Sequence, residues 1–167
     1  RSLVVTLDRP VQGGVQCTRG HPDGIRDNSV PSGDLSYNTA KLFGDKSCYF
    51  SLWGARAHGD LPQGARSGGG FSIGYPNDFW EWNADASQLG DAMIPALGFV
   101  PRLGTRSYHL WSSVKPRPDE KGPLGWARQF YFNTDFNQAV GLDGITHSRV
   151  HYLSPLDVFT QKSAPLA

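Results

Sequence analysis

The segment SCYFSLW, residues 47–53, alternates between two kinds of position. In an extended chain Cys48, Phe50 and Leu52 fall on one side, and the residues between them, a serine and two aromatics, fall on the other. An apolar side opposite a mixed side is the pattern of a half-buried β-strand. The segment therefore predicts a β-rich fold, and the rest of the chain can be read outward from it.

Segments of similar composition recur on both sides of this strand. They are rich in β-branched and aromatic residues and are bounded by turn residues, and they cover 2–9, 71–75, 108–114, 128–134 and 149–153. Glycine, proline, aspartate and asparagine dominate 18–34, and glycine dominates 54–70. We expect both of these ranges to be loops, and the second to be a mobile flank of any site beside it.

Three segments carry local helix signals. The ranges are 35–43 and 84–94, which follow the capping residues Asp34 and Asn83, and 154–162, which begins with the capping residue Ser154. Together with the strands, they predict one domain over residues 1–167 that is mainly β, with α+β character at its margins. The simplest architecture is a β-sandwich or a partly open barrel with two or three short helices.

Charge and hydropathy patterning argue against two classes of partner. Lys and Arg together number 16 and Asp and Glu number 15, and the basic residues do not gather into a run. A nucleic-acid-binding domain usually carries a clustered basic surface, so we expect no nucleic-acid partner. The chain has no stretch of about 18 consecutive apolar residues, so we expect no membrane span.

The cysteines bear on the compartment. Cys17 and Cys48 are the two cysteines of the chain, and its first residue is Arg1 rather than methionine. In an oxidising compartment a Cys17–Cys48 disulfide would stabilise the fold by about 3–4 kcal/mol. In a reducing compartment the same pair would be two thiols. The even cysteine count and the missing methionine favour a secreted, extracellular protein with the disulfide formed.

Residues 75–83, YPNDFWEWN, hold the strongest functional signal. In an extended chain Trp80 and Trp82 share one face and make an apolar platform about 7 Å long. Acceptors that can bind hydroxyls surround them, namely Asn77, Asp78, Glu81, Asn83 and Asp85. Stacking on an aromatic ring together with hydrogen bonds is how proteins bind sugars. The segment predicts a carbohydrate or glycan ligand held by Trp80, Trp82, Asp78 and Asn83.

Other interpretations of the same segment stay open. The two indoles can simply be core, because tryptophan buries a large area. Glu81 with Asp78 can form a catalytic pair for a small secreted hydrolase or toxin that cleaves a glycosidic or N-glycosidic (NAD-type) bond, which would fit a virulence factor. A third possibility is a structural or partner-binding module. Trp53, Trp111 and Trp126 are expected in the core.

A second polar cluster follows at 133–151. Asp135, Asn137 and Asp143 offer oxygen ligands of the kind that calcium prefers, which makes calcium a candidate cofactor. The competing interpretation is a β-turn near Gly141–Gly144 in which aspartate side chains bond the nearby backbone. The sequence favours the turn and leaves the calcium site as the alternative.

Overall fold

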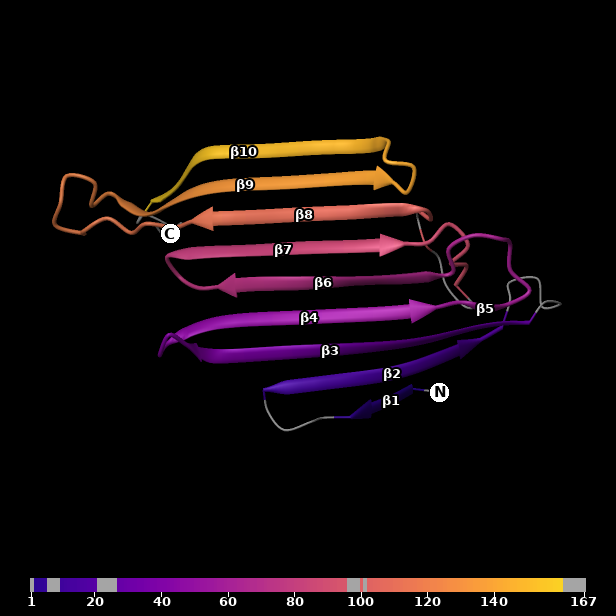
Figure 1. The fold of residues 1–167 in the computed structure, drawn as a ribbon. Helices are drawn as coiled ribbons and strands as arrows, with labels where there is room; N and C mark the ends of the chain where they lie inside the picture. Colours follow the sequence, from indigo (N-terminus) through magenta and orange to yellow (C-terminus); the bar gives the residue numbers. More distant parts are fainter. Residues whose placement is uncertain (1, 6–9, 21–26, 96–99, 101, 161–167) are drawn as a thin grey trace, which may run out of the picture.

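The computed structural model describes residues 2–5, 10–20, 27–95, 100 and 102–160. Over these ranges the chain forms one open antiparallel sheet in which, apart from the short β5, successive strands lie side by side (Figure 1). The order is β1-β2-β3-β4-β6-β7-β8-β9-β10, and β5 pairs with β3. The strands are β1 (Ser2–Val5), β2 (Val11–Arg19), β3 (Asn28–Leu42), β4 (Lys46–Arg56), β5 (His58–Gly59), β6 (Ser67–Pro76), β7 (Trp80–Leu89), β8 (Thr105–Val114), β9 (Ala127–Gly141) and β10 (Thr146–Thr160).

The described strands do not form the predicted β-sandwich or partly open barrel. The chain is mainly β, as expected, but its described strands make a single layer (Figure 1). Short connections such as 43–45, 77–79 and 142–145 force successive strands to lie side by side. All of the described strands are used in this one sheet, so none is left among them to form a second layer.

The three predicted helices are wrong, and within the described ranges the structure has no helix. Residues 35–42 lie in β3, residues 84–89 lie in β7, and residues 154–160 lie in β10. The first two are paired with a strand on each side, so the backbone hydrogen bonds of the ladders replace those of a helix. Pro155 falls in a register shift of β10, where an edge strand tolerates a residue without a backbone donor.

The predicted strands are found, and apart from the first they are longer than the sequence indicated. Of the strand predicted over 2–9, Ser2–Val5 form β1, and residues 6–9 lie outside the described ranges. Residues 47–53 form the middle of β4, between β3 and β6. The predicted loops are correspondingly shorter. Residues 54–56 extend β4, residues 67–70 begin β6, and residues 28–34 begin β3, whereas residues 21–26 lie outside the described ranges.

The alternation of side chains gives the sheet two chemically different faces. Directly paired residues of an antiparallel ladder lie on the same side, so the registers assign each position to a face. The apolar face carries Val15, Leu35, Phe50, Leu52, Phe71, Ile73, Tyr75, Trp80, Trp82, Tyr108, Leu110, Val114, Phe132 and Phe136. The other face, here called the polar face, carries Asp34, Ser36, Ser51, Ser72, Glu81, Asn83, Asp85, His109, Ser113, Asn133 and Asp135, together with the aromatic residues Tyr49, Trp53, Trp111 and Tyr152.

A small buried core lies at one end of the sheet. We call this the loop end, because the connections from β4 to β6 and from β7 to β8 lie there; the opposite end, with the β3–β4 and β6–β7 turns, is the hairpin end (Figure 1). Val30, Ala57 and Met93 form the core, and Leu61 and Leu89 pack against it. Its strand residues belong to the polar side of the sheet, so the side chains of the apolar face lie outside this core.

Candidate functional site

Three aromatic rings cluster on the apolar face near the hairpin end. Tyr75 on β6 stacks on Trp82 of β7 at a centroid distance of 6.4 Å, and Trp80 lies 6.3 Å from Trp82 and 6.1 Å from Tyr75. The two indoles share a face, as the alternation predicted. Trp80 is 48% exposed. We call Tyr75, Trp80 and Trp82 the aromatic triad; its outermost ring is accessible to a ligand.

A pocket of about 460 Å³ opens beside the aromatic triad. Tyr75, Phe79 and Trp80 supply its aromatic wall. Its polar residues come from the β3–β4 and β6–β7 turns and are Asp45, Lys46, Asn77 and Asp78. We call this the turn pocket. It combines ring surface with charged and amide groups in one place.

Ion pairs and hydrogen bonds hold the polar wall of the turn pocket. The two carboxylate oxygens of Asp78 each accept a hydrogen bond from the Arg117 guanidinium at 2.7 Å. Lys46 Nζ lies 2.9 Å from Asp45 Oδ2, and its hydrogen bond to Asp45 raises the pKa of Lys46. Asn77 Oδ1 accepts a hydrogen bond from the backbone amide of Ser47, and Asn77 Nδ2 donates one to the Ser47 carbonyl oxygen. The pocket is therefore preorganised on both turns.

Two of the predicted site residues lie on the other side of the sheet. Glu81 and Asn83 are on the polar face, opposite the rings that flank them in sequence. Glu81 Oε2 accepts a hydrogen bond from Lys115 Nζ at 2.6 Å. Asn83 donates through Nδ2 to the Tyr49 hydroxyl at 2.7 Å. Of the predicted ligand-binding residues, Trp80 and Asp78 line the turn pocket, Trp82 supports it, and Asn83 does not reach it.

The remaining tryptophans are not a core. Trp53 lies on the polar face and is 38% exposed, and Trp126 lies in the β8–β9 connection and is 57% exposed. Trp111, also on the polar face, is half-buried. The expectation that these three residues fill an interior is wrong, because a single layer has no interior between sheets.

His109 on β8 lies between two carboxylates on the polar face. Its Nδ1 is 3.0 Å from Asp85 Oδ2, and its Nε2 is 3.2 Å from Asp135 Oδ2. Partial burial acts to lower the pKa of His109, but the hydrogen bonds to Asp85 and Asp135 outweigh it and raise the pKa above the ordinary 6.5. Burial acts to raise the pKa of Asp85, and hydrogen bonds led by that from Ser72 bring it below the ordinary 3.8. The three residues form a charged cluster that the sequence did not reveal.

The residues considered for calcium do not converge. Asp135 and Asn137 lie on β9, where Asn137 Nδ2 donates to Asp135 Oδ1. Asp143 lies beyond β9 in the β9–β10 turn, and its Oδ1 accepts a hydrogen bond from the Ile145 amide at 2.9 Å. This is the turn geometry of the competing interpretation. Among the residues that the structure describes, no group of three or more His, Cys, Asp or Glu side chains is placed to hold a metal ion.

The predicted disulfide is wrong, because Cys17 and Cys48 are not bonded to each other. Cys17 is on β2 and Cys48 is on β4, and β3 lies between them. Cys17 is opposite Pro31 and Cys48 is opposite Thr39, so they meet β3 at well-separated positions. Two strand spacings alone amount to about 9.6 Å, beyond the roughly 7 Å limit for the Cα atoms of a disulfide.

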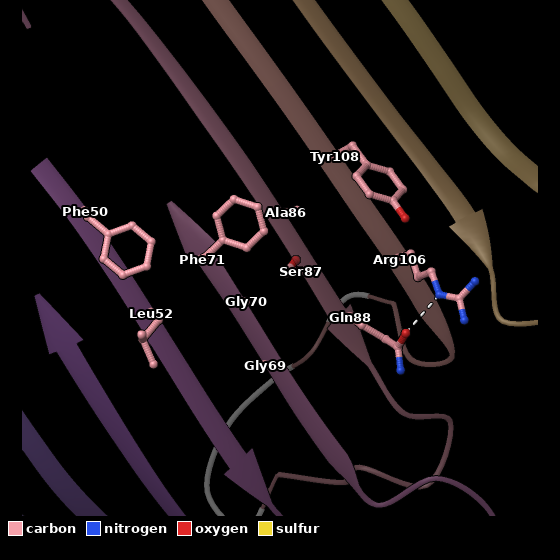
Figure 2. A pocket seen from close by; sticks show the side chains of 10 residues that line it. All are labelled: Phe50, Leu52, Gly69, Gly70, Phe71, Ala86, Ser87, Gln88, Arg106 and Tyr108. Atoms are coloured by element: carbon pink, nitrogen blue, oxygen red, sulfur yellow. Dashed lines mark hydrogen bonds between the residues drawn. The ribbon is translucent and has the colours of Figure 1, made fainter. Parts of the chain in front are cut away.

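A shallow hollow of about 630 Å³ lies in the middle of the apolar face (Figure 2). Phe50, Leu52, Phe71 and Tyr108 project around it, and the positions between them are small, with Gly69 and Ala86 (Figure 2). Arg106 and Gln88 border it toward the loop end, and Arg106 Nε donates to Gln88 Oε1 at 2.8 Å (Figure 2). The hollow thus combines an apolar surface with the guanidinium of Arg106, which its hydrogen bond to Gln88 holds in place.

No known protein family, curated protein or solved structure matches this chain significantly. In the described part of the chain, no helix is long and apolar enough to cross a membrane. Function is therefore inferred from the chemistry of the sites themselves.

Proposed function

We propose that the protein binds a carbohydrate through the turn pocket, with the exposed face of Trp80 as the stacking surface. The observation that carries this proposal is the meeting of an accessible indole with Asp45, Lys46 and Asp78 around one pocket of about 460 Å³. In this proposal the protein works outside the cell, where glycans are displayed. The sugar approaches from the hairpin end.

The chemistry of the pocket suits a pyranose ring. The Trp80 indole N–H is already used, because Nε1 donates to Ser112 Oγ at 3.0 Å. This bond orients the ring and leaves its π-face for the C–H groups of a sugar. Carboxylates accept from several directions, so Asp45 and Asp78 can bind hydroxyls while each keeps its cationic neighbour. Lys46 Nζ adds a donor.

Binding is favoured over cleavage by the position of Glu81. Glycoside hydrolysis by paired carboxylates needs both groups beside one bond, about 5–9.5 Å apart. Glu81 lies on the polar face and is held by Lys115, whereas Asp78 lies in the β6–β7 turn and is held by Arg117. A hydrolase or toxin that used Glu81 and Asp78 as its catalytic pair would need both carboxylates beside one bond, although they are held at different places on the sheet. We therefore propose a binding protein.

The test is a glycan array and a titration of its hits with the full chain. Trp80→Ala should reduce the affinity at least about fivefold, because aromatic stacking contributes on the order of 1–3 kcal/mol per ring. Trp126→Ala removes an indole of similar exposure from the β8–β9 connection and serves as the matched control. Trp80→Phe should retain part of the affinity. Loss of binding in Trp126→Ala but not in Trp80→Ala would refute the proposal.

A further inference from the structure

The apolar face is uncovered across the described sheet. Its side chains extend from β2 to β10, a width of roughly 34 Å at about 4.8 Å per strand. Leu35, Phe71 and Leu110 are exposed within it. Soluble monomers rarely expose contiguous apolar patches larger than about 300–600 Å², and larger patches mark contact with another molecule. The question is which molecule fits.

Charged side chains are sorted between the two faces. The carboxylates of the described strands lie on the polar face and are Asp34, Glu81, Asp85, Asp135 and Asp157. Arg56, Arg106 and Arg149 lie on the apolar face toward the loop end. Lys46 lies on the same face at the hairpin end, beside the turn pocket. The apolar band is therefore bordered by arginines at the loop end and, at the hairpin end, by Lys46 together with Asp45 and Asp78.

We propose that anionic phospholipid covers the apolar face, with an acyl chain in the central hollow and a lipid phosphate on Arg106. The hollow offers Phe50, Phe71 and Tyr108 to the chain (Figure 2). The bond to Gln88 uses only Nε of Arg106, so the two terminal amino groups of its guanidinium are available to a phosphate. The proposal does not depend on the carbohydrate site.

The ends of the band also agree with a lipid surface that lies against this face. Lys46 and Arg56 lie at opposite ends of β4 on the same face, separated by roughly 33 Å of extended chain, so both can reach headgroups. Trp82 lies near the hairpin end of the band, and tryptophans concentrate where hydrocarbon meets headgroups. The sequence has no long run of consecutive apolar residues, but this contact does not need one. Successive side chains of a strand point to opposite faces, so an apolar face is built from alternate residues.

A second copy of the chain fits the face less well. If two apolar faces met, the arginines at the loop end would find no strand carboxylate on the opposing face, because those lie on the polar side. Asp45 and Asp78, at the hairpin end, are already paired with Lys46 and Arg117. Burying unpaired charges is costly. Lipid phosphates can pair with the arginines at the loop end while the acyl chains cover the apolar side chains. Lipid therefore accounts for both the apolar band and the arginines beside it.

Flotation of the full chain with vesicles tests the headgroup contact. Vesicles of phosphatidylcholine with one quarter phosphatidylglycerol should carry the protein, and Arg106→Gln should weaken the partition about fivefold, the effect expected for one basic residue near an anionic surface. Arg102→Gln is the matched control, because Arg102 bonds Ser148 Oγ on the polar side. Equal loss in the two variants, or equal binding to pure phosphatidylcholine, would overturn the role of Arg106.

Quenching by brominated phospholipid tests which face meets the acyl chains. Single-tryptophan variants are made with phenylalanine at the other four positions, one retaining Trp82 on the apolar face and one retaining Trp111 on the polar face. Brominated chains should quench Trp82 strongly and Trp111 weakly. Equal quenching of both, or a stable dimer by sedimentation that ignores vesicles of either composition, would refute lipid as the occupant.

Discussion

Glu81 Oε2 lies 2.6 Å from Lys115 Nζ, on the face of the sheet opposite the indoles of Trp80 and Trp82. Residues adjacent in sequence are thus divided between two surfaces with different chemistry. The apolar side presents rings to a ligand, and the polar side holds a network of charges.

Glu81→Gln should lower the free energy of unfolding by about 1 kcal/mol, the net value of a charge-assisted hydrogen bond reduced for partial exposure. Lys115 is 16% exposed and would be left without its carboxylate. Urea denaturation followed by circular dichroism measures the change. Glu120→Gln, in the exposed β8–β9 connection, is the control. Because Glu81 lies across the sheet, carbohydrate affinity should be unchanged; a large loss of affinity would contradict the division of faces.

The His109 cluster predicts a pH dependence with a defined sign. The pKa of His109 is raised by folding, so its stabilisation is fully present below pH 6.5 and is lost as the pH rises through the raised value. The pKa of Asp85 is lowered, so its contribution is present above pH 3.8 and is lost as the pH falls through the lowered value. Stability from this cluster is therefore greatest between these limits.

Denaturation midpoints from pH 5 to 9 check this dependence. The wild type should lose more stability above pH 6.5 than His109→Gln does. Asp135→Asn removes one of the two acceptors and should give an intermediate slope. Parallel curves for the wild type and His109→Gln would show that the histidine is not held as a cation.

Gly74→Ala should destabilise the sheet by about 1–3 kcal/mol, the usual cost of overpacking. Tyr49 is the cross-strand neighbour of Gly74, and a Cβ at Gly74 would collide with its ring. Displacing the ring also breaks the bond from Asn83 to the Tyr49 hydroxyl. Gly33→Ala is the matched control, because its nearest atom would be the Gly14 carbonyl oxygen at 3.5 Å. Chemical denaturation should show a lower free energy of unfolding for Gly74→Ala than for Gly33→Ala.

The cysteine placement predicts stability that does not respond to reductant. Because β3 separates Cys17 from Cys48, no bond between them stabilises this fold. Thermal unfolding of the full chain with and without a strong thiol reductant should give the same midpoint. A drop corresponding to about 3–4 kcal/mol, the value expected for a closed loop of this kind, would mean that the two cysteines do pair.

Several features of this protein were accessible from the sequence because they are local. Alternation of side chains is a property of any extended backbone, so residues 47–53 indicated a strand and the sharing of a face by Trp80 and Trp82 followed directly. Local signals misled where they competed with strand pairing. Capping residues such as Asp34 and Asn83 also occur in strands and turns, and the ladders on both sides of β3 and β7 outweigh them.

The sequence by itself thus determined the β class, the positions of several strands and the sharing of one face by Trp80 and Trp82. Only the tertiary structure decided that the strands form one layer, that His109 meets Asp85 and Asp135, and that Cys17 and Cys48 lie apart. These depend on strand order and register, which connect residues far apart in sequence. Register is set by the summed free energy of all the cross-strand pairs, and no single segment contains that sum.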